Sequence, residues 1–132
     1  MKHVFVSLCL LLFSFITYGQ EKEGWIYVGR AIDSTLYYVK KEVASYNKIW
    51  TMTILPNWSY KKISYKNVTV KELVQFDCGD KKIRSYQMVF YSSKGNLIIN
   101  EQYEQFETKW ENSIPDTMGE MVLNKICELF GK

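Results

Sequence analysis

The sequence has little histidine, proline or glycine, and these scarcities exclude several classes of protein. Only 2 of its 132 residues are proline and 7 are glycine, which excludes a collagen-like or low-complexity chain. The glycines are scattered, so they form neither a phosphate-binding loop nor a dinucleotide-binding fingerprint. Hydrophobic residues make up 47% of the chain and charged residues 23%, so a disordered chain is also excluded. The length allows one domain around one hydrophobic core.

The single histidine lies in a segment that has the pattern of a secretory signal peptide. A short basic start, Met1-Lys2-His3, precedes an almost wholly apolar run over residues 4–18. This run is shorter than the roughly 20 apolar residues that cross a bilayer as a helix. Thr17 and Gly19 are small enough for a signal peptidase site. We therefore expect a cleaved signal peptide over residues 1–19.

Residues 20–132 are then expected to form one exported domain, periplasmic or secreted, with no transmembrane segment. This part of the chain has no histidine, which removes Ser-His and Cys-His nucleophile pairs and nearly all ordinary zinc sites. We therefore expect no enzyme, no metal and no cofactor. Cys9 follows bulky Leu8 inside the apolar run, a context that does not fit a lipidated cysteine.

Two cysteines remain after the signal peptide, Cys78 and Cys127. An even pair in an exported protein indicates a disulfide. Closing a loop of about 50 residues would stabilise the domain by roughly 4 kcal/mol in the chain-entropy picture. A redox or metal pair, the alternative, would need closely spaced cysteines or further ligands, and the sequence has neither.

Aromatic residues make up 16% of the chain, a content that favours strands. The predicted strands are Trp25–Val28, Thr35–Val39, Ile49–Leu55, Leu73–Cys78, Ile83–Tyr91 and Leu97–Tyr103. Turn residues lie between them at Asp33-Ser34, Gly79-Asp80 and Ser92–Asn96. These strands predict an antiparallel meander.

Two segments have no clear strand pattern. Pro56-Asn57 is expected to end a strand, and residues 58–70 are expected to form a long loop or an irregular connection. Over residues 101–111 the aromatic residues are spaced by three and four, which leaves a helix open as an alternative to strand and loop.

The last element is predicted to be a helix. Thr117 and Glu120 form a capping box, with Asp116 adding negative charge and Pro115 suiting the entry. Apolar residues then recur every three or four positions, and Gly131 ends the pattern. Such a stripe needs a sheet to cover it, so the predicted fold is α+β: an antiparallel sheet with one C-terminal helix packed on it and tied by the disulfide.

Several framework residues together resemble one known family, the surface-adhesin protein E-like domain of exported bacterial proteins. The similarity rests on Trp25 with Val28, Tyr37-Tyr38-Val39, Trp50, Phe76-Asp77-Cys78 followed by Arg84, Tyr91 with Gly95, Trp110, Ile114-Pro115-Asp116-Thr117, Glu120 and Cys127. The resemblance implies about six antiparallel strands and a C-terminal helix joined to them by a disulfide. The adhesin that gives the family its name binds host matrix and plasma proteins and carries a lipid anchor. No binding residue is carried over, because only framework positions match.

A basic aromatic segment is the sharpest local charge feature. Residues 43–71 hold five lysines and no acid. The predicted binding surface within it is Trp58, Tyr60, Lys61, Lys62, Tyr65 and Lys66. Ammonium groups attract anions and rings supply contact area, so the partner would be an envelope or extracellular protein, or an anionic polymer. The alternative is a solvated loop with its rings packed beneath it. A pI of 8.7 and export both weigh against nucleic acid.

Other charged residues allow further interpretations. Residues 100–120 are rich in acid, so copies could pair this region with the basic segment in a homodimer. Asp77 and Arg84 flank the turn at Gly79-Asp80 and are expected to form a structural ion pair. The four tryptophans are expected in the core.

These patterns lead to one hypothesis and two alternatives. The hypothesis is a non-catalytic, exported bacterial domain that binds a protein or polymer, as an adhesin does. The first alternative is a structural or stress-related envelope protein that mainly self-associates, and the second is a histidine-free hydrolase that uses carboxylates.

Overall fold

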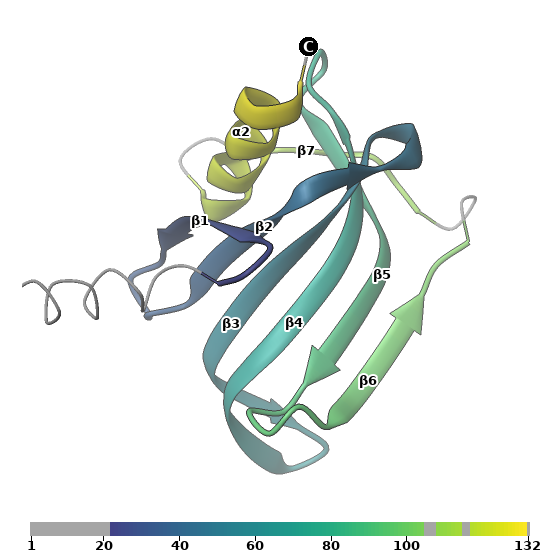
Figure 1. The fold of residues 1–132 in the computed structure, drawn as a ribbon. Coiled ribbons are helices and arrows are strands. Elements are labelled where there is room, and N and C mark those ends of the chain that lie inside the picture. The colour runs from purple at the N-terminus through teal and green to yellow at the C-terminus, as the bar shows by residue number, and fades with distance from the viewer. Residues whose placement is uncertain (1–21, 105–107, 115–116, 132) are drawn as a thin grey trace, which may run out of the picture.

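A computed structural model describes residues 22–104, 108–114 and 117–131 (Figure 1). The predicted signal peptide, Phe106, Pro115 and Asp116 lie outside these residues. Within the described ranges, none of the helices has the length and apolar character that crossing a bilayer requires.

Six antiparallel strands follow one another across a single sheet, in chain order, as a meander. They are β1 Trp25–Arg30, β2 Leu36–Ala44, β3 Lys48–Tyr60, β4 Ile63–Asp77, β5 Lys82–Tyr91 and β6 Leu97–Gln102. A short strand, β7 (Glu111–Asn112), pairs with the first residues of β5, and a 3-10 turn, η1 (Ser45–Asn47), joins β2 to β3. The one α-helix of the described residues is α2, Met118–Phe130. The predicted α+β meander is therefore confirmed.

The strand register divides the side chains between two faces. Directly paired residues share a face, and successive residues along a strand alternate. One row across β1 to β6 is Ile26, Val39, Thr51, Glu72, Met88 and Glu101. The adjacent row, on the opposite face, is Tyr27, Tyr38, Met52, Lys71, Val89 and Asn100.

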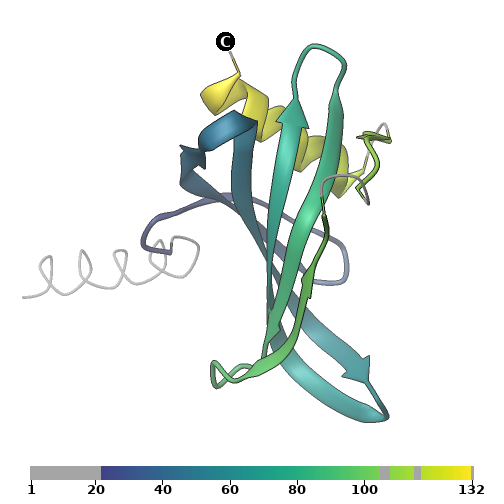
Figure 2. The same cartoon turned by 90° about the vertical axis from the view of Figure 1, so that its right-hand side faces the viewer.

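Helix α2 covers the β1–β2 end of the first face, which we call the helix-covered face (Figures 1 and 2). Its buried residues pack on the first row and its neighbours to form the core. The members are Val39, Ile49, Val74, Phe76, Val122, Leu123 and Ile126. The face that carries Tyr27 and Lys71 is called the helix-free face.

The helix begins and docks as its sequence predicts. The Thr117 hydroxyl accepts a hydrogen bond from the Glu120 backbone N–H at 3.2 Å, which caps the helix. Cys127 is joined to Cys78, whose Cα lies 5.7 Å away, so the helix is tied to the end of β4. Gly29 permits close approach of β1, because a Cβ there would lie 2.8 Å from the sulfur of Met121.

The prediction of a loop over residues 58–70 is wrong. β3 continues to Tyr60 and pairs with β4 through a two-residue turn. Pro56 does not end β3, because the ladder skips it: Leu55 pairs with Val68 and Asn57 with Lys66. A proline that has no ladder bond to donate is compatible with a strand.

The end of β2 also differs from the sequence-based prediction, whereas the choice for residues 101–111 holds. β2 extends to Ala44, five residues beyond the predicted Val39. Residues 101–104 and 108–111 contain no helix, which confirms the choice of strand and loop for the described part of that segment.

Candidate functional site

The far ends of β3 and β4 form a two-stranded arm, residues 55–68, which projects past the rest of the sheet (Figures 1 and 2). The last pairing of β2 with β3 joins Leu36 to Ile54, and that of β5 with β4 joins Tyr91 to Thr69. Beyond those pairs, β3 and β4 pair only with each other. We call this ribbon the β3–β4 arm, and it carries all six residues of the predicted binding surface.

Aromatic rings stack along the β3–β4 arm. The Trp58 ring lies 5.5 Å from that of Tyr60 and 5.8 Å from that of Tyr65, measured between centroids. It also stacks on Phe90 of β5 at 4.8 Å, which holds the arm against the sheet. Trp58, Tyr60 and Tyr65 are each partly buried, so they are neither enclosed in the core nor freely exposed.

The lysines of the arm are exposed, and one of them lies over the ring of Tyr60. Lys61 and Lys62 form the turn, where both have positive φ, 49° and 66°. Two-residue hairpin turns of this kind favour asparagine and glycine, so lysine is costly at both positions. The Lys61 ammonium lies 5.3 Å from the centroid of the Tyr60 ring, and the Lys66 ammonium donates a hydrogen bond to the Asn57 side chain.

The structure does not bring Asp77 and Arg84 together as an ion pair. The register places Gln75 opposite Arg84 and Lys82 opposite Asp77, so the two residues are offset along the strands. The Asp77 carboxylate accepts a hydrogen bond from the Asp80 backbone N–H at 3.1 Å. Arg84 donates to the Gln75 side chain at 2.7 Å and lies 4.4 Å from the centroid of the Trp110 ring. Each therefore has a local structural contact of its own.

The tryptophans lie outside the core, contrary to the prediction. Trp25, Trp50 and Trp58 are partly buried, and Trp110 is 39% exposed. The buried core is built from aliphatic residues with Phe76 and Tyr38. Indole rings at a surface supply contact area for a partner, so these positions are candidates for recognition.

The helix-free face holds two lysines that no local motif indicates. Lys40 and Lys71 both lie over the Trp25 ring, with their ammonium nitrogens 4.8 and 5.9 Å from its centroid. Strand alternation could have placed each residue on this face, but only the register of four strands brings them together.

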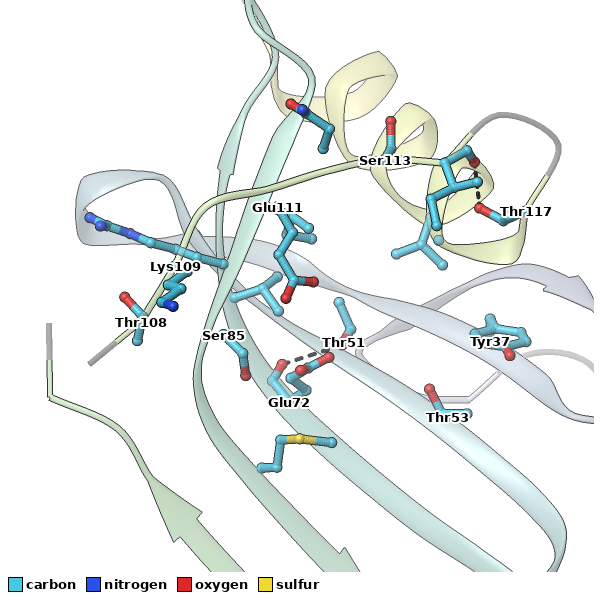
Figure 3. Close-up of a pocket in the computed structure, with 18 of the residues that line it drawn as sticks. Tyr37, Thr51, Thr53, Glu72, Ser85, Thr108, Lys109, Glu111, Ser113 and Thr117 are labelled. Atoms are coloured by element: carbon cyan, nitrogen blue, oxygen red, sulfur yellow. Dashed lines mark hydrogen bonds between the residues drawn. The ribbon is translucent and has the colours of Figure 1, made fainter. Parts of the chain in front are cut away.

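A cleft of about 540 Å³ lies on the other face, between the sheet and the segment over residues 108–114 (Figure 3). Glu72 and Ser85 lie at its floor, and Glu111 points into it from above. The Thr51 hydroxyl donates to the Glu72 backbone carbonyl at 3.3 Å and so helps to hold the floor in place.

The Glu72 carboxyl is the most perturbed acid of this cleft. Burial raises its pKa, and the nearby Glu111 carboxylate raises the pKa further. The Ser85 hydroxyl faces Glu72 and lowers the pKa in part, although its geometry falls short of a formed hydrogen bond. Among the described residues no three metal-ligating side chains gather around a common point. The cleft is therefore lined by two carboxyl groups, Glu72 and Glu111, and by two basic side chains, Arg84 and Lys109.

The architecture and the disulfide agree with a comparison to known families. The family model described as surface-adhesin protein E matches residues 25–128. No curated protein matches the chain. The matched range runs from the first residue of β1 to the last turn of α2, and it includes both disulfide cysteines. The chain belongs to the surface-adhesin protein E family.

Proposed function

We propose that the chain is an exported, non-catalytic binding module of the bacterial envelope, which holds an acidic protein or polymer through the β3–β4 arm. The family supports an adhesin-like role at the surface. The observation that carries the proposal is the arm itself, a projecting ribbon with three exposed lysines and no acid. The apolar residues 4–18 support export.

The arm combines the two contributions that recognition of an acidic surface needs. Its stacked rings offer rigid contact area, because Trp58 is held by Phe90 and loses little freedom on binding. Its ammonium groups attract the partner and contribute mainly to the association rate, so binding should weaken as salt is added.

The turn of the arm supports a role in binding rather than in stability. Lysine at two left-handed positions costs folding free energy, and residues held in such conformations cluster at functional sites. The charge of Lys61 and Lys62 at the tip is thus gained at the expense of stability.

Charge reversal on the arm tests the proposal. Capture of purified chain on immobilised polyglutamate, and its pull-down of partners from envelope extract, would be compared at low and high salt. The triple variant K61E/K62E/K66E should lose capture in both assays. The matched control K22E/K41E/K81E changes the net charge equally at exposed lysines away from the arm, and it should retain capture. Equal loss in both variants, or none in either, would contradict the proposal.

Self-association, the first alternative, predicts a different result. Light scattering would then show a stable dimer of the purified chain, together with no capture in either assay. A monomer that captures polyglutamate through the arm would contradict it.

The cleft favours a second candidate function, hydrolysis by a pair of carboxylates. Glu72, with its raised pKa, would act as the acid, and Glu111 would be the partner. Hydrolysis of chromogenic glycosides that is lost in both E72Q and E111Q would establish this function. No hydrolysis by the wild-type chain would contradict this second function and favour the binding module.

A further inference from the structure

A groove of about 470 Å³ crosses the helix-free face, and every strand of the meander contributes to its lining. The residues that line it are Trp25 of β1, Lys40 of β2, Trp50 of β3, Lys71 of β4, Gln87, Val89 and Tyr91 of β5, and Leu97 and Asn100 of β6. We call it the helix-free groove. Its volume lies within the range of roughly 300–1,000 Å³ that small-molecule sites occupy.

The groove is built on paired backbone rather than on loops. Lys71, Val89 and Asn100 stand in one cross-strand row, and Trp25 pairs directly with Lys40. Side chains on hydrogen-bonded strands hold their positions better than side chains on loops. The groove is therefore a preformed site, which keeps the cost of ordering low when a ligand binds.

Two positive charges lie in this groove, on Lys40 and Lys71. Lys40 and Lys71 each lie within 6 Å of the Trp25 ring, and Lys71 also lies 5.5 Å from that of Tyr91. None of the residues lining the groove is acidic. Neither lysine forms a salt bridge with another described residue. An anion that reached both ammonium groups would relieve their repulsion and gain from the low polarity of the neighbouring rings.

A polar pair lies at the side of the groove. The Gln87 amide N–H donates to the Asn100 side-chain oxygen at 3.1 Å. This bond fixes both amides and leaves the Gln87 oxygen as an acceptor and the Asn100 amide nitrogen as a donor for a ligand. Adjacent donor and acceptor groups of this kind match the hydroxyl groups of a sugar ring.

We propose that the helix-free groove binds a uronic acid unit of an acidic saccharide. The sugar carboxylate pairs with Lys40 and Lys71, and the ring hydroxyls bond to Gln87 and Asn100. The C–H face of the sugar lies on the Trp50 ring, since the face of an aromatic ring is negative and attracts the weakly positive C–H groups. This inference is independent of the β3–β4 arm, because the groove shares no residue with residues 55–68.

An acidic peptide is the competing ligand, and the groove fits it less well. A peptide carboxylate would also pair with Lys40 and Lys71. A glutamate side chain, however, has no flat C–H face to lie on Trp50 and no cluster of hydroxyls for the amides of Gln87 and Asn100. Both the Trp50 ring and the amide pair would be left unused.

Titration with defined oligosaccharides tests the inference. Tryptophan fluorescence and calorimetry would follow binding of galacturonate, mannuronate and glucuronate-containing tetrasaccharides to the folded chain. At least one should bind with saturation. Its methyl ester, which lacks the charge, should bind with an affinity at least about tenfold lower. Binding should also weaken as salt is added. Failure of all three probes would overturn the inference.

Matched variants distinguish the groove from the arm. K40M/K71M keeps the aliphatic stems and removes both charges, so it should lose about tenfold or more in affinity for the saccharide. K61M/K62M on the arm should bind the saccharide as the wild type does. A melting temperature equal to that of the wild type would show that K40M/K71M folds.

Two results would contradict the saccharide assignment. One is unchanged affinity in the folded K40M/K71M variant. The other is binding of triglutamate in the groove as tightly as of the best saccharide, which would identify an acidic peptide as the ligand instead.

Discussion

The two faces of the sheet are built from the same six strands, yet they differ in nearly every physical respect. The helix-covered face carries the aliphatic core, the helix, the disulfide and the cleft that Glu72 lines. The helix-free face carries two tryptophans and two lysines in a groove, and neither lysine forms a salt bridge within the described part of the chain. Both faces bury apolar residues, since Tyr38, Met52 and Val89 of the helix-free face are buried, but only the helix-covered face packs against the helix.

The difference is sharpest at two consecutive residues of β4. Lys71 faces the groove, where its ammonium group lies over aromatic rings. Glu72 faces the cleft, where burial raises its pKa. A shift of one residue in register would exchange them, so the two sites depend on the same pairing of strands.

The largest expected effect on stability comes from removing the Cys78–Cys127 disulfide on the helix-covered face. Replacing both cysteines in C78S/C127S, or reducing the bond, should lower the free energy of unfolding by roughly 4 kcal/mol. That is a large share of the stability of a domain of this size. Urea unfolding would measure the change. On the helix-free face, K40M/K71M should alter the free energy of unfolding by about 0.5 kcal/mol or less. Equal losses of stability in K40M/K71M and C78S/C127S would contradict the distinction between the faces.

A matched pair of truncations sharpens the comparison at apolar positions. Ile126 is 0% exposed in the core, so I126A should cost about 2–5 kcal/mol through lost burial and the cavity left behind. Leu97 lines the groove and is 60% exposed, so L97A should cost well under about 1 kcal/mol. Chemical denaturation of both variants would compare the two losses. Equal losses would mean that the helix-free face has a core of its own.

The smallest effect concerns Glu72 and depends on pH. Because its pKa is raised in the folded chain, the folded state holds a proton that the unfolded state has released, so stability falls as the pH rises between the two pKa values. E72Q removes this loss and should raise the melting temperature by a few degrees at pH 7, with little change near or below about pH 4. Differential scanning fluorimetry at both values would measure it. A gain of equal size at both values would contradict a charge effect, and K71M should show no such pH dependence.

In the β3–β4 arm the basic aromatic residues were identified from the sequence, but the secondary structure predicted for them, a loop, was wrong. Residues 58–70 show no clear alternation in apolar character, because the rings of Trp58, Tyr60 and Tyr65 share one face with polar neighbours around them, and buried residues return only at Val68 and Val70. Pro56 suggested an end to the strand. On the β2 side, however, the pairing ends where Leu36, the first residue of β2, lies opposite Ile54. Beyond that pair no strand on this side needs a hydrogen bond from residue 56, so a proline is compatible with β3. Exposure of the basic residues was predictable, whereas the length of the ribbon was not.

The candidate sites divide in the same way. All six residues of the predicted binding surface lie on the arm, because they are close in sequence and a hairpin keeps them close in space. The groove was missed, since Trp25, Lys40, Trp50 and Lys71 come from four strands and no spacing in the sequence relates them. The Asp77–Arg84 pair failed because the turn before β5 sets a register in which Lys82, not Arg84, faces Asp77.

The sequence by itself determined the features that depend on neighbours along the chain. These are the cap at Thr117, the hairpin around Gly79-Asp80, the amphipathic stripe of α2 and the availability of two cysteines for one bond. Only the tertiary structure decided which tryptophans stay at the surface, which acids line the cleft and which lysines lie over the Trp25 ring. Those outcomes depend on strand register and on how far the helix reaches across the sheet, and both arise from contacts between residues far apart in the chain.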